Sequence, residues 1–396
     1  MPSIEKRNRG YCITVSAGYT SSGKKIRKKM TWTPTPGMTE RQIEKEVQRQ
    51  AILFGERIQT GLSMDGNIKF EDFAERWMKE YSETQHKAKG VFQNKLALDR
   101  INKALGHIKL AKLQPHHIIQ FLHQMEEPGQ NKKTGKGLSA KTVLNHHRVI
   151  SSILSTAVNW GIITDNPAKR VKPPKVHRLE ARSLDDAQTL QLLEALEDVP
   201  AKFRIATETL LFSGARRGEL LGLKWDDIDF QACTMDINKA SLYLPNKGIY
   251  EDSPKNENSK RVIKLPRIVI EHLQQYRAIQ AAERLQCGDL WTGAGHVFTQ
   301  WNGSPMHPDS LTSWFSKFIK RYNEGAGCPL PLVSLHSLRH TNASLLIAEG
   351  IDIRTVAKRL GHAQVSTTMD IYSHAIKSAD ANASDALEAR LLAKPQ

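Results

Sequence analysis

The first sixty residues alternate between apolar and polar positions and then change to a helical period. Residues 11–19 and 25–32 each alternate in the manner of half-buried strands, and a Ser-Ser-Gly turn signal lies between them. Thr39 and Gln42 have the spacing of a capping box, and apolar residues follow at helical intervals as far as Gly61. The pattern predicts a two-stranded hairpin whose dry face is covered by one helix.

The next hundred residues have a helical period throughout, because apolar residues recur every three or four positions. The predicted helices cover residues 70–81, 98–108, 116–125 and 140–162. Ser139 is the expected N-cap of the last helix, and a basic, glycine-rich loop precedes it. Residues 166–178 combine adjacent prolines with several cations, which predicts an extended, charged linker and a domain boundary.

The last part of the chain mixes both periods. Ser183 is the expected N-cap of an apolar helix, and the helical pattern continues to residue 223. Three short strand-like runs then surround the turn-rich segment 246–260, and helical patterns return afterwards. These features predict a mainly helical module with a small antiparallel sheet, so the whole chain is expected to be a multidomain α+β protein.

Positive charge is concentrated in the first half of the 396 residues, which together carry a net charge of +16. Residues 1–65 hold 12 basic and 6 acidic side chains, residues 66–178 hold 20 against 9, and residues 179–396 hold 25 against 26. Lysines scattered for solubility would be spread more evenly, so the segregated excess favours modules that bind the phosphate backbone of a nucleic acid. We take these three ranges as the expected domains.

Two basic segments are the candidate nucleic-acid contacts. One lies on the predicted hairpin and the other on the glycine-rich loop and the start of the following helix. The candidate residues are Lys24, Lys25, Arg27, Lys28, Lys29, Lys132, Lys133, Lys136 and Lys141.

The composition argues against a membrane-spanning or exported protein. No stretch approaches the roughly 20 apolar residues of a transmembrane helix, and the N-terminus lacks the apolar core of a secretory signal. The four cysteines are scattered without a CxxC pair, which disfavours a disulfide framework or a zinc module. A reducing bacterial cytoplasm, in association with the nucleoid, is the expected location.

Side chains suited to phosphoryl transfer occur in four separate pieces of the last module. Arg216 follows a glycine-containing break, and Glu219 lies one helical turn further on, where it could orient the guanidinium. Lys255 lies in the turn-rich segment, with Lys260 five residues along as an alternative. A surface Arg–Glu pair and a solvated turn lysine are the ordinary interpretations of these two pieces.

The third piece places His336 and Arg339 on one face of a predicted helix, with His340 adjacent. A zinc site at the two histidines is disfavoured, because the segment HSLRH lacks the glutamate of HExxH and has no nearby cysteine or carboxylate. The fourth piece has His362 after a glycine and Tyr372 ten residues later. A buried tyrosine with a satisfied hydroxyl is the ordinary alternative there.

Taken in order, SGARRGEL, a hairpin lysine, HSLRH, LGH and the tyrosine closely resemble the catalytic signature of the tyrosine recombinases, the phage integrase family. The resemblance covers residues 179–396 and fixes Arg216, rather than Arg217, as the match. By layout, residues 66–178 look like the SAM-like core-binding domain of that family, and residues 1–65 like the arm-binding domain of integrases from conjugative transposons and temperate phages. The departures from the family pattern, such as Ser-Gly-Ala-Arg for Thr-Gly-Leu-Arg, remove no functional group.

The resemblance implies a site-specific integrase with six catalytic residues. Tyr372 would be the nucleophile and Lys255 the general acid, and the guanidiniums and histidines would stabilise the phosphate. This set is Arg216, Lys255, His336, Arg339, His362 and Tyr372. The chemistry implies no cofactor and no metal, because the bond energy is kept in a protein–DNA link. The implied partners are core-type and arm-type duplex DNA, a homotetramer, and an excisionase or host DNA-bending protein.

Two alternatives use the same residues differently. A type IB topoisomerase would share the chemistry but reseal the strand it cut, and a silent regulator would bind DNA without cleaving it. The expected arm-binding domain disfavours the first, and the complete set of functional groups disfavours the second. The tail beyond Tyr372 has a further amphipathic run, Ala383 to Leu391, which is expected to form a helix that docks onto a neighbouring protomer.

Overall fold

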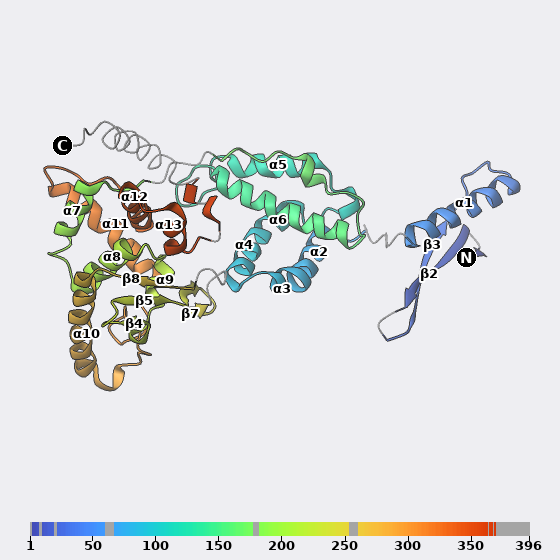
Figure 1. The fold of residues 1–396 in the computed structure, drawn as a ribbon. Coiled ribbons are helices and arrows are strands. Elements are labelled where there is room, and N and C mark those ends of the chain that lie inside the picture. The colour runs from blue at the N-terminus through green and yellow to red at the C-terminus, as the bar shows by residue number, and fades with distance from the viewer. Residues whose placement is uncertain are drawn as a thin grey trace, which may run out of the picture. The chain divides into compact units, whose positions relative to one another are not determined.

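The structure is a computed structural model that describes residues 2–7, 10–19, 22–59, 67–176, 182–252, 260–362, 364–366 and 368–369. The chain divides into two compact units, residues 1–178 and 179–396 (Figure 1). Each unit is described by itself. The expected helix stop at Gly61, the residues Lys255 and Tyr372, and the predicted tail helix lie outside the described residues.

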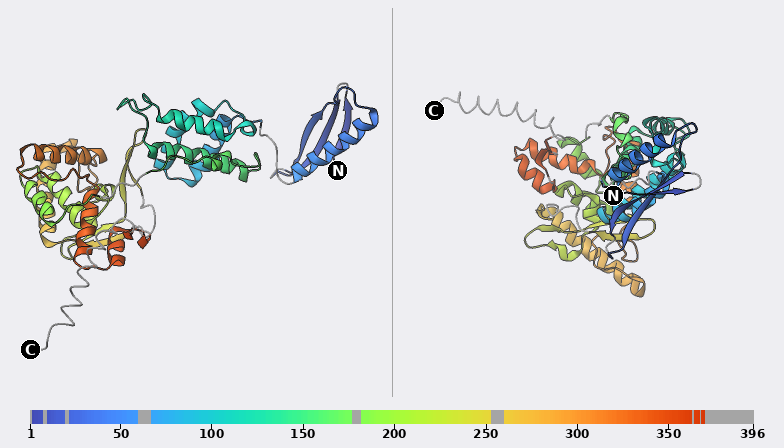
Figure 2. Two further views of the ribbon diagram at one scale, coloured as in Figure 1. Left: turned by 90° about the horizontal axis from the view of Figure 1, so that it is seen from above. Right: turned by 90° about the vertical axis from the view of Figure 1, so that its right-hand side faces the viewer.

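The chain begins with a three-stranded antiparallel sheet in which β2 (Gly10–Tyr19) lies between β1 (Ser3–Arg7) and β3 (Lys25–Trp32). Helix α1 (Glu40–Gln59) lies along one side of the strands (Figure 2). Buried Ile13 of β2 packs with the helix there, so the predicted helix-covered hairpin is present. The predicted capping box also forms, with the Thr39 main-chain nitrogen donating to Gln42 Oε1 over 3.0 Å.

The additional strand β1 was not predicted. All five of its residues are exposed, so it has no apolar face that could produce an alternating pattern. It is held by its main-chain pairing with β2.

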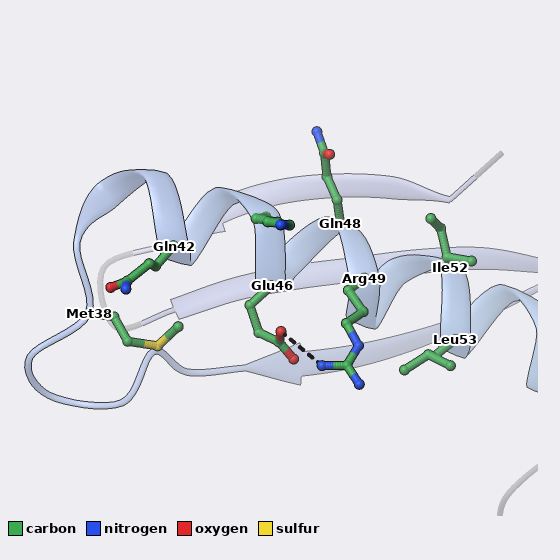
Figure 3. A pocket seen from close by; sticks show the side chains of 8 residues that line it. Met38, Gln42, Glu46, Gln48, Arg49, Ile52 and Leu53 are labelled. Carbon is green, nitrogen blue, oxygen red and sulfur yellow. Dashed lines mark hydrogen bonds and ion pairs between the residues drawn. The ribbon is translucent and has the colours of Figure 1, made fainter.

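A shallow hollow lies on the side of α1 that faces away from the strands (Figure 3). Its lining combines apolar Ile52 and Leu53 with polar and charged side chains, among which Arg49 pairs with Glu46 over 3.4 Å. No candidate site residue from the sequence lies in it.

Between residues 67 and 176, which the structure describes without a gap, four principal helices form, as predicted. They are α2 (Phe70–Trp77), α4 (Ala88–Leu105), α5 (Pro115–Glu126) and α6 (Ala140–Asn159). A π-turn at Met78–Ser82 and the short α3 (Glu83–Gln85) continue α2, and α4 begins ten residues before its predicted start. The N-cap prediction is confirmed, since the Ser139 hydroxyl accepts a 3.3 Å hydrogen bond from the Thr142 main-chain nitrogen.

The predicted linker is partly wrong. Residues Pro167–Arg170 form a 3-10 turn, and the Ala168 and Val171 side chains are buried in the core of the helical bundle. His147 Nε2 lies 3.0 Å from the Ala168 carbonyl oxygen, which ties this turn to α6. Ala168 and Val171 lie among charged residues and form no periodic apolar pattern, so the sequence did not predict their burial.

The second unit is mainly helical, as predicted. Its helices are α7 (Asp186–Ala195), α8 (Ala201–Ser213), α9 (Arg217–Leu221), α10 (Arg267–Cys287), α11 (Pro308–Gly325), α12 (Ser337–Ala348) and α13 (Ile353–Leu360). The expected N-cap at Ser183 is wrong, because Asp185 caps α7 and accepts from the Gln188 nitrogen over 2.8 Å. Buried residues of α8, α10 and α11 form one core with the sheet.

The described residues of this unit form two small antiparallel sheets. Strands β4 (Ile228–Asp229), β5 (Thr234–Ile237) and β8 (Arg261–Lys264) form one, and β6 (Ala240–Leu244) and β7 (Gly248–Asp252) form the other. Strand β7 lies inside the segment predicted to be turn-rich. The predicted fold class, an α+β protein with a hairpin-and-helix region, a helical bundle and a mainly helical module, is confirmed. Among the described residues, no helix is long and apolar enough to cross a membrane.

Candidate active site

Arg216 is positioned by a tight break between two helices. Gly214 ends α8 in the left-handed conformation, with a φ of 64°, and Arg216 is the N-cap of α9. A Cβ at position 214 would lie 2.7 Å from Asn342 Oδ1 and from Leu360 Cδ2. The backbone angle and the close packing therefore both require glycine before the arginine.

The predicted Arg216–Glu219 pair forms. Arg216 Nη1 donates to Glu219 Oε1 over 2.7 Å, and the Arg216 main-chain nitrogen donates to Glu219 Oε2 over 3.0 Å. The Arg216 side chain is 40% exposed, while that of Glu219 is only 5% exposed. Arg217 turns to α11 instead, where its Nη1 donates to Thr312 over 2.6 Å and pairs with Asp309 over 3.1 Å.

Helix α12 brings the HSLRH segment to the same break. His336 is its N-cap and Arg339 lies in its first turn. Arg339 is buried, with 3% of its surface exposed, and its Nη1 donates to the Gly214 carbonyl over 2.7 Å. Asn342, one turn on, donates to the Phe212 carbonyl over 3.1 Å. The end of α8 is therefore clamped by two side chains of α12.

The two histidines of this segment pack edge to face, with their ring centroids 5.0 Å apart. Burial, together with the charges of Arg339 and Arg216, lowers the pKa of His336. Burial and the neighbouring His336 and Arg339 lower the pKa of His340 to about 4. Both rings are therefore neutral at neutral pH.

The turn after α13 completes the group. Gly361 ends the helix with a φ of 67°, and its carbonyl accepts a 3.2 Å hydrogen bond from Arg216 Nη2. His362 follows, with its Nδ1 2.8 Å from the hydroxyl of Thr368. Burial, and then the charges of Arg339 and Arg216, lower the pKa of His362 to about 4.

Two further arginines, which no sequence motif selects, belong to the cluster. Arg261 of β8 donates from Nη2 to Glu219 Oε2 over 2.8 Å and from Nε to the Arg359 carbonyl over 2.6 Å. Arg359 donates to the Phe212 carbonyl over 2.8 Å. The strand-like run that begins at Arg261 also contains Lys264, so its pattern did not distinguish Arg261 from an exposed strand residue.

The carboxylate of Glu219 lies within this group of guanidiniums. Burial alone would raise the pKa of Glu219, but the hydrogen bond and charge of Arg261, followed by those of Arg216, hold it below its ordinary value. Glu219 is therefore ionised, and the cluster stays positively charged.

The structure thus brings four of the six predicted site residues together, namely Arg216, His336, Arg339 and His362. Arg216 contacts the carbonyl of Gly361, which precedes His362, and Arg339 contacts the carbonyl of Gly214, two residues before Arg216. The positive charges of both arginines lower the pKa of both histidines. Fixed guanidiniums beside neutral imidazoles suit a phosphodiester, because guanidinium binds phosphate bidentately and imidazole can donate or accept a proton. The part of the chain that the structure describes holds no cluster of three or more metal-ligating side chains.

The candidate DNA-binding residues lie on two surfaces of the first unit. Lys25, Arg27 and Lys29 are exposed on β3, on the face opposite the half-buried Lys28 and Met30. Exposed Lys24 comes just before this strand. Lys132, Lys133, Lys136 and Lys141 are all exposed. The loop that carries the first three is closed by main-chain hydrogen bonds, one of them 2.9 Å long from Asn131 to Lys136.

Comparison with known proteins was made from sequence and from structure. The sequence matches the phage integrase family over residues 182–378 and the phage integrase N-terminal SAM-like domain over residues 69–125. A XerC-like tyrosine recombinase of Caldanaerobacter subterraneus subspecies tengcongensis is 29% identical, over 95% of this chain and 95% of that protein. The ICEBs1 integrase of Bacillus subtilis is 28% identical, over 64% of this chain and 66% of that protein.

Solved structures share the fold. The Tn1549 transposon integrase, in complex with a circular intermediate DNA, superimposes with a TM-score of 0.64 and 21% identity, over 77% of this chain and 95% of that one. A lambda integrase tetramer bound to a Holliday junction gives 0.54 and 18%, over 92% of this chain and 96% of that one.

Proposed function

The chain belongs to the phage integrase family of tyrosine recombinases, and on this premise we propose that it is a site-specific DNA recombinase that integrates and excises a mobile element. The observation that carries the proposal is the convergence of Arg216, Arg339, His336 and His362, which come from three separated segments, around one positively charged centre. Such a centre matches the charge that develops on a phosphodiester during transfer.

In the proposed reaction the Tyr372 hydroxyl attacks the scissile phosphorus and passes its proton to a neutral histidine of the site. The new bond joins the tyrosine oxygen to phosphorus, and the bond to the 5′-oxygen breaks, which leaves a 3′-phosphotyrosyl enzyme. Lys255 gives the departing oxygen its proton as general acid, so a free 5′-hydroxyl is released. A partner strand's 5′-hydroxyl then attacks the phosphotyrosine and restores the tyrosine. No nucleotide or redox cofactor is needed, because the phosphodiester energy is conserved in the covalent link.

The described residues have distinct roles in this step. The Arg216 side chain is 40% exposed whereas Arg339 is buried, so Arg216 would bind the non-bridging oxygens directly. Buried Arg339 would add charge and hold the Gly214 turn that presents Arg216. His336 and His362, neutral before DNA binds, would hold the phosphate and assist proton transfer.

The basic surfaces of the first unit extend the proposal to DNA binding. We assign Lys25, Arg27 and Lys29 on the exposed face of β3, with Lys24 just before the strand and half-buried Lys28 on its other face, to arm-type DNA. We assign the loop residues Lys132, Lys133 and Lys136, with Lys141 at the start of α6, to core-type DNA. Assembly as a homotetramer on DNA follows by analogy with the lambda integrase tetramer. An excisionase or a host DNA-bending protein would set direction, and DNA in the bacterial cytoplasm would be the place of action.

The test uses two labelled duplexes that carry the element's ends. A recombinase forms a covalent protein–DNA adduct and then joins strands of the two duplexes. A parallel assay uses a supercoiled plasmid that carries one end of the element. An adduct with relaxation of this plasmid but no joined strands would instead indicate a topoisomerase, and binding without adduct would indicate a silent regulator.

A further inference from the structure

Glu219 is shared between two arginines that differ in exposure. Its Oε1 accepts from Arg216 over 2.7 Å and its Oε2 accepts from Arg261 over 2.8 Å. The Arg261 side chain is only 6% exposed, against 40% for Arg216. One carboxylate therefore lies between a buried guanidinium and an accessible one.

The position of Arg261 is fixed by its surroundings. Its Nε donates to the Arg359 carbonyl over 2.6 Å, and Gly361 packs so closely that a Cβ there would lie 2.8 Å from Arg261 Nη1. Gly361 is also the residue whose carbonyl accepts from Arg216. Arg261 thus links β8 to both supports of Arg216, which are the Glu219 carboxylate and the turn at the end of α13.

The charges give this linkage a chemical consequence. A lone Arg216–Glu219 pair would be electrically neutral, and its carboxylate would repel an approaching phosphate across a low-dielectric site. Arg261 supplies the compensating charge for Glu219, so the triad keeps one net positive charge, which is located on the accessible Arg216. Because Arg261 is buried, it can provide this compensation without touching DNA.

We propose that Arg261 is a positioning residue that neutralises Glu219 and thereby leaves the charge of Arg216 available to the scissile phosphate. The inference rests on the proposed function, since it takes Arg216 as the phosphate-binding group. It goes further by giving the reaction a residue that acts only through its neighbours.

The test compares Arg261→Gln, Arg261→Lys and the double variant Glu219→Gln with Arg261→Gln in the full-length chain. Adduct formation is timed on a nicked duplex at saturating protein, and DNA affinity is measured separately by gel shift. Arg261→Gln is expected to slow adduct formation about 100-fold, the usual cost of one lost electrostatic donor, with little change in affinity. Arg261→Lys, which keeps the charge, should fall between it and the wild type.

The double variant separates charge compensation from mere packing. It removes the carboxylate together with its buried counter-ion, and replacing a whole buried pair is better tolerated than breaking one. We expect the double variant to form the adduct at least ten times faster than Arg261→Gln does. A packing role predicts instead that the double variant is as slow as the single variant or slower, and that result would overturn the proposal.

Matched controls keep the outcomes distinct. Arg267→Gln alters an exposed Arg–Glu pair of the same unit, with 86% of the arginine side chain exposed, and should leave the rate unchanged. If Arg261→Gln does not fold, the double variant decides. A folded double variant within tenfold of the wild-type rate would support the proposal, and one slowed more than tenfold would refute it. If the wild type forms the adduct and Arg261→Gln forms it at the full rate, only this inference is refuted. If the wild type forms no adduct, the proposed recombinase function itself is refuted.

Discussion

The guanidinium of Arg339 donates a 2.7 Å hydrogen bond to the carbonyl of Gly214, the residue that ends α8 two positions before Arg216. Two arginines that are 123 positions apart in the sequence are thereby built into one turn. The relationship implies that the geometry of this turn, and not charge alone, controls the candidate site.

Replacing Gly214 by alanine tests that implication. The added Cβ meets Asn342 and Leu360 at 2.7 Å in a left-handed backbone conformation, so we expect a loss of roughly 2–4 kcal/mol in the free energy of unfolding and slower DNA cleavage. Gly350→Ala is the matched control, because Gly350 has a φ of 77° but nothing within 4 Å of the added Cβ. Equal losses in the two variants, measured by thermal and chemical unfolding, would show that packing against α12 is unimportant.

Arg216→Lys is expected to leave the fold and DNA binding intact and to slow adduct formation about 100- to 1,000-fold, since an ammonium cannot make the bidentate contact. Arg217→Lys should retain most of the rate, because Arg217 contacts Asp309 and Thr312 on α11. Rates are compared on the same nicked duplex. If the two variants behaved in the opposite way, Arg217 would have the role given to Arg216.

Stability should fall with acidification below neutral pH. Burial and neighbouring groups lower the pKa of His340 and His362 from 6.5 to about 4. Between pH 6.5 and pH 4 these histidines are therefore protonated in the unfolded chain but largely neutral in the folded chain. The stabilisation is complete above pH 6.5 and is lost progressively as the pH falls toward 4. Melting temperatures measured from pH 7 to pH 5 should decrease less in His340→Asn than in the wild type, while exposed His123→Asn should leave the slope unchanged.

The arm-binding assignment is tested on the exposed face of β3. Changing Lys25, Arg27 and Lys29 to glutamine should weaken binding to arm-type DNA and reduce the salt dependence of log K by roughly two to three, at about 0.9 per phosphate contact. The control changes Lys45 and Arg49 on the outer side of α1. A larger effect from that control would assign the DNA-binding face to the helix.

The local elements were largely predictable from the sequence, and their errors have physical causes. Capping boxes and amphipathic helices depend on residues close in sequence, so the N-caps at Thr39 and Ser139 were found. Ser183 and Asp185 both precede α7 and could both act as its N-cap. The carboxylate of Asp185, directly before the helix, accepts from the Gln188 nitrogen and is the cap. Ala168 and Val171 are too small a pattern to distinguish a packed turn from a linker.

Site residues could be predicted from the sequence only where they belong to a short motif. Arg216 and Glu219 lie one helical turn apart, so their pair followed from spacing. Arg261 of β8 and Glu219 of α9 are 42 positions apart in the sequence, so no local pattern could indicate their contact. The burial of Arg339 likewise depends on α8 and α12 packing together.

The covalent link between Tyr372 and DNA can be measured on a denaturing gel of protein incubated with a labelled, nicked duplex of the element's end. The wild type and Tyr322→Phe, which changes another tyrosine of the same unit, should each give a protein–DNA band that survives denaturation and disappears on protease treatment. Tyr372→Phe should bind the same duplex with unchanged affinity and give no such band. A Tyr372→Phe variant that still forms the adduct would contradict the account and move the nucleophile to another residue.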